Sequence, residues 1–253
     1  MKTVVFLHAF PLDHRMWDGI ADDVAISGWQ VFTPDLRGCG SSADWKEQEP
    51  SLRVLAEDVL SLMDNYGISN FVVAGCSLGG YVAMELIRIA PSRVAAAILI
   101  DTKASADNEE QRENRLRVAS QVEEAKNTEA FCRLMLPNLL GKTTTEQSPE
   151  IVEYTKALLQ DSRVNGVANL QRAMSKRLDS HQVLSDFQGP ILSIRGSEDT
   201  VASAADHSRI MNAARDGIHV ELSECGHLAP IEKPKETSDA VIDFLNRVSS
   251  PTC

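Results

Sequence analysis

The stretch Phe71-Val72-Val73-Ala74-Gly75-Cys76-Ser77-Leu78-Gly79-Gly80 decides the fold of this chain, because an apolar run passes directly into Gly-x-Ser-x-Gly. The apolar run predicts a buried strand, and the residues that follow Ser77 predict a helix. A chain that turns from strand to helix at one residue strains that residue and crowds its neighbours, and Gly75 and Gly79 relieve the crowding. We therefore expect the Ser77 hydroxyl to stand clear at the carboxyl end of a sheet.

Strand-like and helical patterns alternate on both sides of this stretch. Apolar, β-branched runs at 3–7, 29–33, 71–74, 94–100, 191–195 and 218–222 predict strands, and helical patterns separate most of them. Such alternation predicts an α/β fold with a parallel sheet covered by helices on both faces. Among the connecting patterns, we expect a helix from Asp13 to about Ile26.

The segment 105–187 differs from the rest of the chain. It holds charged, helix-favouring stretches at 108–126, 128–136, 149–160 and 164–177, and Pro137-Asn138, Gly141 and Pro149 are expected to break them. Strand-like alternation is absent from its sequence. We predict a core domain of residues 1–104 and 188–253 and a helical cap, or lid, of residues 105–187.

The composition excludes several classes of partner. The 253 residues are 43% hydrophobic and 24% charged, which is ordinary for a globular protein, and the net charge is −11. A chain this acidic, without a basic stripe, is not expected to bind nucleic acid. No apolar run is long enough to span a membrane, and Thr3–Leu7 is too short for a signal peptide.

The cysteines favour a reducing compartment. Their number is odd, they are scattered, and no Cys-x-x-Cys pair occurs, so neither a disulfide framework nor a zinc site is indicated. We expect a cytoplasmic protein. The five are Cys39, Cys76, Cys132, Cys225 and Cys253.

A serine hydroxyl becomes a good nucleophile only when a base removes its proton. His227 follows the last predicted strand, within Glu224-Cys225-Gly226-His227, at the edge where parallel sheets present functional loops. His8 also ends a strand and is expected to brace the loop near Ser77. The other four histidines lie in predicted helices or inside a strand, so we expect them to be structural or solvated.

The base needs a carboxylate to orient it, and this acid should follow a strand between Ser77 and His227. Asp199, in Arg195-Gly196-Ser197-Glu198-Asp199, meets this condition after the fifth strand. Asp101, at the end of the fourth strand, is the alternative. We prefer Asp199.

Two backbone N–H groups are expected to form an oxyanion hole. The N–H of Leu78 lies at a helix N-terminus beside the nucleophile. The second should come from His8-Ala9-Phe10-Pro11 after the first strand, where the N–H of Phe10 is best placed and Pro11 has none to donate.

These motifs, with Asp35-Leu36-Arg37-Gly38-Cys39-Gly40-Ser41 and Gly226-His227, resemble the α/β-hydrolase superfamily, specifically its cofactor-free serine hydrolases with a helical cap. The resemblance covers essentially the chain outside the cap. It implies a catalytic triad of Ser77, Asp199 and His227, with the N–H groups of Phe10 and Leu78 as the oxyanion hole. The chain starts at the family's usual third strand, which implies six parallel strands without the N-terminal hairpin.

Carboxylesterases, enol-lactonases and acyl-homoserine lactonases are the most similar members. The resemblance implies hydrolysis of a small or medium ester or lactone through an acyl-enzyme, by a monomer or homodimer, without metal or organic cofactor. Hydroxynitrile cleavage, cofactor-free perhydrolysis and a hormone-receptor role on the same scaffold are the alternatives. A receptor would show a burst of acylation and little steady-state turnover.

Overall fold

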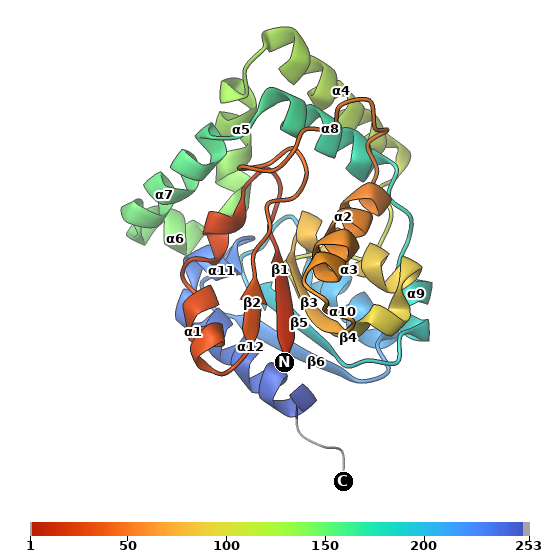
Figure 1. Ribbon diagram of the computed structural model, residues 1–253. Coiled ribbons are helices and arrows are strands. Elements are labelled where there is room, and N and C mark those ends of the chain that lie inside the picture. Colours follow the sequence, from red (N-terminus) through yellow and green to blue (C-terminus); the bar gives the residue numbers. More distant parts are fainter. Residues whose placement is uncertain (1, 250–253) are drawn as a thin grey trace.

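A six-stranded sheet forms the centre of the computed structural model, which describes residues 2–249 (Figure 1). Met1 and residues 250–253, which include Cys253 and the last residues of the predicted core range, lie outside the described part. All pairings are parallel, and the strand order is β2-β1-β3-β4-β5-β6. The strands are β1 Thr3–Leu7, β2 Gln30–Phe32, β3 Phe71–Cys76, β4 Val94–Ile100, β5 Ile191–Gly196 and β6 Gly217–Leu222.

Alternate residues of each central strand enter two different apolar cores. In β1, Val5 and Leu7 belong to one core, whereas Val4 and Phe6 belong to the other. This two-residue period is the geometry of a strand that is buried on both faces. The predicted fold, a parallel α/β sheet of six strands, is confirmed.

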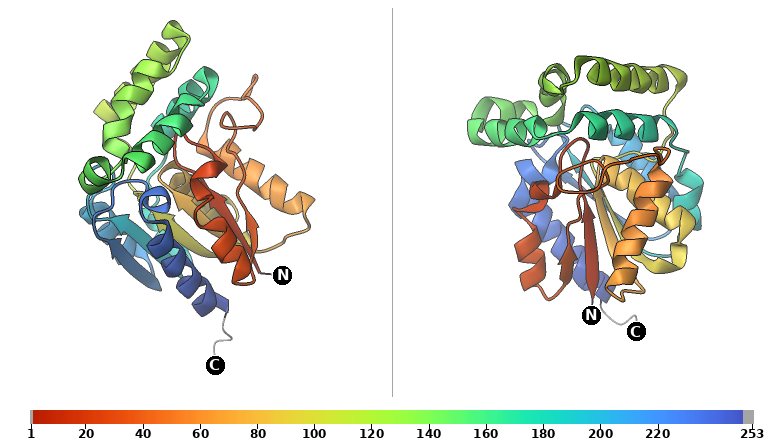
Figure 2. Two further views of the ribbon diagram at one scale, coloured as in Figure 1. Left: turned by 90° about the vertical axis from the view of Figure 1, so that its left-hand side faces the viewer. Right: turned by 45° about the horizontal axis from the view of Figure 1, so that its top comes forward.

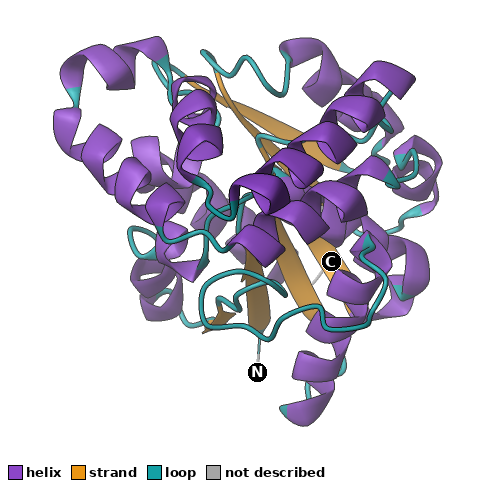
Figure 3. Ribbon diagram, turned by 90° about the horizontal axis from the view of Figure 1, so that it is seen from above, coloured by secondary structure: helices purple, strands orange, loops and turns teal. Residues whose placement is uncertain are grey.

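Helices cover both faces of the sheet, as the view from above shows (Figure 3). Side chains of α2 Leu52–Asn65, α3 Leu78–Ile89, α9 His181–Asp186 and α10 Ala204–Ala213 join the core that contains Val5. The opposite core takes side chains from the 3-10 helix His14–Trp17 and from α1 Ala21–Ile26, α11 Ala229–Glu232 and α12 Pro234–Ser249.

Five helices lie across one end of the sheet (Figures 1 and 2). In chain order they come between β4 and β5. They belong to residues 105–187, which we call the helical insertion. Its last helix, α9, packs instead against α3 and α10. No described helix combines the length and hydropathy required of a membrane span. The five helices are α4 Glu109–Ala125, α5 Glu129–Leu139, α6 Lys142–Gln147, α7 Pro149–Gln160 and α8 Val164–Ser175.

Three details of the structure differ from the local predictions. The helix expected from Asp13 to Ile26 is interrupted around Gly19, where a side chain would overlap Pro234. Helix α5 continues through Pro137 to Leu139, because a proline in the last turn removes only one hydrogen bond. The short, threonine-rich α6 was missed, since its local propensity is low and its contacts lie far away in the chain.

Candidate active site

Ser77 stands at the turn between β3 and α3 with φ 51° and ψ −109°, a conformation that non-glycine residues rarely adopt. Its N–H donates to the carbonyl of Ile100 at 2.9 Å, and Thr102 Oγ1 donates to the Ser77 carbonyl at 2.8 Å. These two bonds to the neighbouring strand end hold the strained turn in place.

The glycines beside Ser77 are required by close backbone packing. A Cβ on Gly75 would overlap the backbone of Gly79, and one on Gly79 would overlap the carbonyl of Leu7 in β1. The two glycines therefore let α3 begin directly against the sheet. Ser77 is left half-buried.

Three side chains form a continuous hydrogen-bonded series at this edge. Ser77 Oγ lies 2.8 Å from His227 Nε2, and His227 Nδ1 lies 2.8 Å from Asp199 Oδ2. Asp199 follows β5, and His227 lies in the loop between β6 and α11. His227 is 3% exposed and Asp199 is 5% exposed, so water screens their interaction weakly.

The pair has opposite pKa shifts. Burial lowers the pKa of His227, but the Asp199 charge and hydrogen bond outweigh it, so the net pKa lies above the ordinary value. Burial raises the pKa of Asp199, but His227 and the N–H groups of Val201 and Ala202, which donate to Oδ1, bring it below the ordinary value. The arrangement favours an ionised carboxylate that orients the ring.

The two expected oxyanion donors have no acceptor among the described residues: none accepts the N–H of Phe10 or of Leu78. Leu78 begins α3, and Phe10 lies in the loop after β1, where the Phe10–Pro11 peptide bond is cis. Ala9 does not adopt a positive φ, so an alanine fits there without strain.

A sequence model of the α/β hydrolase fold matches residues 2–234, which is most of the chain. This chain belongs to the α/β hydrolase family.

The relatives of this α/β hydrolase are enzymes with several activities. It is 27% identical to 3-oxoadipate enol-lactonase 1 of Acinetobacter baylyi, over 97% of this chain and 89% of the relative. The solved structure of a thermophilic esterase from Thermogutta terrifontis, with malate bound, has a TM-score of 0.94 at 29% identity, covering 99% of this chain and 91% of the esterase. A Mycobacterium tuberculosis protein named as a non-heme bromoperoxidase is 23% identical over 88% of this chain and 86% of its own.

Asp101, the alternative acid, has backbone partners instead of His227. Its Oδ1 accepts from the N–H of Gly196 at 2.9 Å, and its Oδ2 accepts from the N–H of Ala229 at 3.0 Å. Burial and the charge of Asp199 raise the pKa of Asp101 to about 7. The side chain thereby joins the strand end of β5 to the start of α11.

His8 is buried and serves the loop after β2. Its Nε2 accepts from the N–H of Leu36 at 2.9 Å, which requires an unprotonated nitrogen, and Nδ1 lies 3.0 Å from the Ala9 carbonyl. Burial keeps the pKa of His8 below its ordinary value. The neutral ring therefore fixes the relation between the loops that follow β1 and β2 in this α/β hydrolase.

Sequence reasoning missed Glu232, which is 5% exposed and lies at the end of α11. Its carboxylate contacts both the loop that carries His227 and the helical insertion. Sequence reasoning also missed Phe131 of α5, which packs against Phe10 with ring centroids 5.7 Å apart. No local sequence pattern predicts these contacts, because the residues that they join lie far apart in the sequence.

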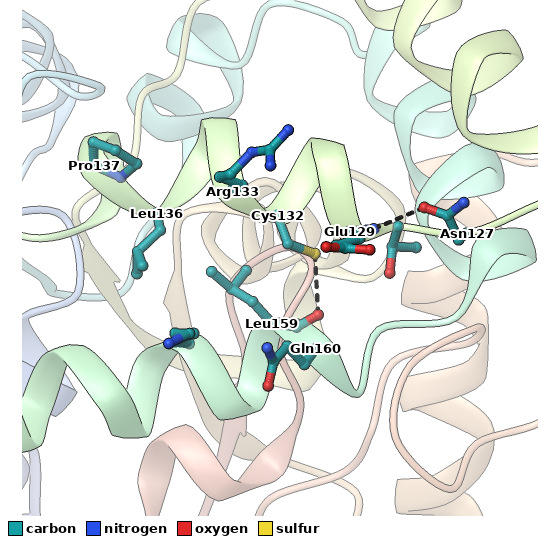
Figure 4. Close-up of a pocket in the computed structure, with 10 residues that line it drawn as sticks. Asn127, Glu129, Cys132, Arg133, Leu136, Pro137, Leu159 and Gln160 are labelled. Atoms are coloured by element: carbon teal, nitrogen blue, oxygen red, sulfur yellow. Dashed lines mark hydrogen bonds between the residues drawn. The ribbon is translucent and has the colours of Figure 1, made fainter. Parts of the chain in front are cut away.

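A cavity of about 420 Å³ lies between α5 and α7, and Figure 4 shows Leu136 and Leu159 within it. Cys132 Sγ, at its wall, donates to the Leu159 carbonyl at 3.1 Å. Ser77, Asp199 and His227 do not line this cavity. It belongs to the helical insertion alone.

Asp13, His14 and Asp35 are close enough together to hold a cation. Their carboxylate oxygens already have donors: both oxygens of Asp13 accept from Arg15, and those of Asp35 accept from His14 and Ser41. A cation would have to displace these bonds. The cluster instead ties the loop after β1 to the loop after β2.

Proposed function

We propose that this α/β hydrolase is a serine hydrolase that cleaves a small or medium carboxylic ester or lactone through an acyl-enzyme. The observation that carries the proposal is the series from Ser77 through His227 to Asp199, with 2.8 Å at each step. The esterase and enol-lactonase names of its relatives support the same class of substrate.

In the proposed reaction, Ser77 Oγ attacks the carbonyl carbon while His227 Nε2 accepts its proton. Asp199 stabilises the imidazolium and keeps the ring in the tautomer that presents Nε2. The alkoxide leaves with the proton from His227, or stays attached as the free hydroxyl end of an opened lactone. A water molecule, deprotonated by His227, then releases the acid and regenerates Ser77.

The developing negative charge on the carbonyl oxygen would be stabilised by the N–H groups of Phe10 and Leu78. Fixed donors in a site that excludes water contribute more than donors in bulk solvent, because no reorganisation is needed during the reaction. The N-terminus of α3 adds a favourable dipole at the same point.

We also propose that residues 105–187 form a cap over a core of residues 1–104 and 188–253. The charged α4 buries only Ala119 and Val122 and exposes most of its other side chains, which is unlike the apolar surface of an interfacial lipase. The site would therefore take acyl groups delivered in solution.

The test combines a fluorophosphonate label with a panel of p-nitrophenyl esters, from acetyl to palmitoyl, and small lactones. We expect one label per chain on Ser77 and the highest rates with short acyl groups. Ser77→Ala should abolish labelling and lower turnover by several orders of magnitude, about 10⁵-fold or more, without loss of folding. A variant that keeps a tenth of the activity, or rates that climb toward palmitoyl, would contradict the proposal.

Perhydrolysis is the second candidate, because one relative is named as a bromoperoxidase. The same acyl-enzyme would then be attacked by hydrogen peroxide in place of water. The test is peroxide-dependent bromination in acetate buffer. If it is faster than ester hydrolysis and is lost in Ser77→Ala, perhydrolysis is favoured over hydrolysis.

A further inference from the structure

Glu232 is a buried carboxylate that accepts four hydrogen bonds and has no ion-pair partner among the described residues. Its Oε1 accepts from the N–H groups of Gly226 and Leu228 at 3.0 and 3.1 Å. Its Oε2 accepts from the N–H of Gly141 at 2.8 Å and from Thr144 Oγ1 at 2.6 Å. A buried charge held only by neutral donors requires all of them, since each lost bond leaves it less compensated.

The first pair of donors flanks His227 directly. The loop 226–229 is neither helix nor strand until Ala229, yet all four of its N–H groups have fixed acceptors. Gly226 and Leu228 donate to Glu232, His227 donates to the Leu139 carbonyl at 3.1 Å, and Ala229 donates to Asp101. The position of the His227 ring thus depends on acceptors from outside its own loop.

The second pair of donors belongs to the helical insertion. Gly141 and Thr144 lie at the start of α6, directly after Leu139, the residue whose carbonyl accepts from His227. Gly141 and Gly226 pack backbone against backbone, because a Cβ on Gly226 would overlap the N–H of Gly141. The segment Leu139–Thr144 and the His227 loop therefore share one carboxylate and one close contact.

We propose that Glu232 is a positioning residue that holds His227 in line with Ser77 and makes this alignment depend on docking of the segment Leu139–Thr144. The role rests on the proposed serine-hydrolase function. Glu232 makes no hydrogen bond to Ser77 or to the imidazole ring; it acts through the backbone on both sides of His227.

Glu232→Gln tests this role with little change of shape. The amide keeps one oxygen and replaces the other by an N–H₂ group, which must face either the loop pair or the insertion pair of N–H and O–H donors. The N–H₂ group then repels the pair of donors that it faces, whereas the carboxylate oxygen at that place accepted hydrogen bonds from them. Displacement of a catalytic group by about 1 Å is enough to lower a rate about 100-fold.

Glu198→Gln is the matched control. Glu198 accepts from the N–H and Oγ1 of Thr143 at 2.8 and 2.6 Å, so it holds the same start of α6. Its carboxylate accepts no hydrogen bond from residues 226–229. The control alters one attachment of α6 but leaves all four hydrogen bonds of Glu232, so the segment Leu139–Thr144 stays docked to the His227 loop.

The measurement is the rate constant for fluorophosphonate labelling of each variant from pH 5 to 9, with the labelled fraction at completion and the steady-state constants for p-nitrophenyl acetate. We expect Glu232→Gln to label completely but about 10- to 100-fold more slowly, with kcat reduced and KM changed less than about threefold. Glu198→Gln should stay within about threefold of wild type.

The acid limb of the labelling rate provides a readout that lost stability would not move. Asp199, Asp101 and Lys103 are the charged groups that act on His227, and the Asp199 interaction keeps its pKa raised. A ring that drifts from Asp199 loses this effect, so the midpoint should move to lower pH in Glu232→Gln. It should stay in place in Glu198→Gln.

Several outcomes would overturn the positioning role. Wild-type rate and midpoint in Glu232→Gln would do so, as would a reduced labelled fraction that reacts at the wild-type rate, or an equal loss in Glu198→Gln. If Glu232→Gln does not fold, Thr144→Val, which removes one donor, must slow labelling at least about threefold, and an unchanged rate refutes the role. Failure of the probe to label wild type would refute the serine-hydrolase proposal itself, and the positioning role with it.

Discussion

Two buried aspartates, Asp101 and Asp199, follow the neighbouring strands β4 and β5, yet their surroundings shift their pKa values in opposite directions. The Asp199 carboxylate contacts His227 and accepts from two N–H groups. The Asp101 carboxylate also accepts from two N–H groups but is repelled by the charge of Asp199. Only the first environment favours a full charge at neutral pH. Burial raises the pKa of both carboxyls, and for Asp199 its partners, His227 first, outweigh this effect.

This difference predicts unequal effects of two conservative substitutions. Asp199→Asn should lower kcat about 10³- to 10⁴-fold, because the amide permits the wrong histidine tautomer. Asp101→Asn should cost far less, since a carboxyl with a pKa of about 7 is already about half protonated near pH 7 and the amide keeps one acceptor. Steady-state kinetics at pH 7 compare the two, and a larger loss in Asp101→Asn would show that the acid is misassigned.

The raised pKa of His227 predicts the direction of the pH profile. The base must be neutral, so kcat/KM should fall as the pH drops through a midpoint above the ordinary value of 6.5. Stability follows the opposite sign: protonated His227 is favoured in the folded state, so its contribution is complete below pH 6.5 and is lost as the pH rises through the higher folded value. Rates from pH 5 to 9 measure the first, and a midpoint well below 6.5 would contradict it.

Residue types and spacing were enough to select three side chains that the structure brings together, but not the residues that support them. Ser77, Asp199 and His227 each follow a readable strand, and parallel strands bring such positions to one edge. Glu232 gave no signal, because its partners Gly141 and Thr144 lie 91 and 88 residues away. From the sequence alone, a glutamate close to a lysine and a proline is expected at the surface. Only the packing of the helical insertion buries it.

At the scale of elements, α8 rests on the loop after β2 through two glycines. A Cβ on Gly166 would overlap the carbonyl of Gly38, and Arg163, just before α8, donates to the carbonyls of Cys39 and Ser42. The helical insertion is therefore fixed at a second place, away from Glu232. The close approach of Gly166 to Gly38 depends on the absence of a side chain rather than on an attraction.

Gly166→Ala should accordingly destabilise the protein, although alanine is the better helix former. The propensity gain is about 1 kcal/mol, whereas overlap with a backbone carbonyl costs about 1–3 kcal/mol, so the overlap should prevail. Asn165→Ala, at the exposed neighbouring position, is the matched control and should be neutral or slightly stabilising. Thermal unfolding of both variants decides it; a higher Tm for Gly166→Ala would contradict the contact.

Element boundaries were predictable where local signals agreed with the fold, and α4 and α7 are examples. Asn108 caps α4 through a capping box, and Pro149 begins α7 at a position where a proline needs no N–H partner. Helix α6 has no such signal. It is held by Glu198 and Glu232, which are contributed by the rest of the fold.

At the scale of the whole molecule, the candidate site is assembled from segments that span most of the chain. Phe10, Ser77, Asp199 and His227 follow β1, β3, β5 and β6, and the helical insertion enters between the second and third of these residues. Strand alternation in the sequence predicted this convergence. It could not predict how the insertion packs, because several amphipathic helices can cover the same edge in different orders.

The four held N–H groups of residues 226–229 have a consequence for solvent exchange. Loop amides usually exchange with deuterium quickly, because no ladder protects them. These amides should instead exchange as slowly as those of a central strand, since each is held by a buried acceptor from outside the loop. Deuterium uptake followed by mass spectrometry would compare this loop with the turn 67–70, and equally rapid uptake in both would contradict the expectation. If the slow exchange is observed, the exchange rates of these loop amides measure how often the molecule opens locally.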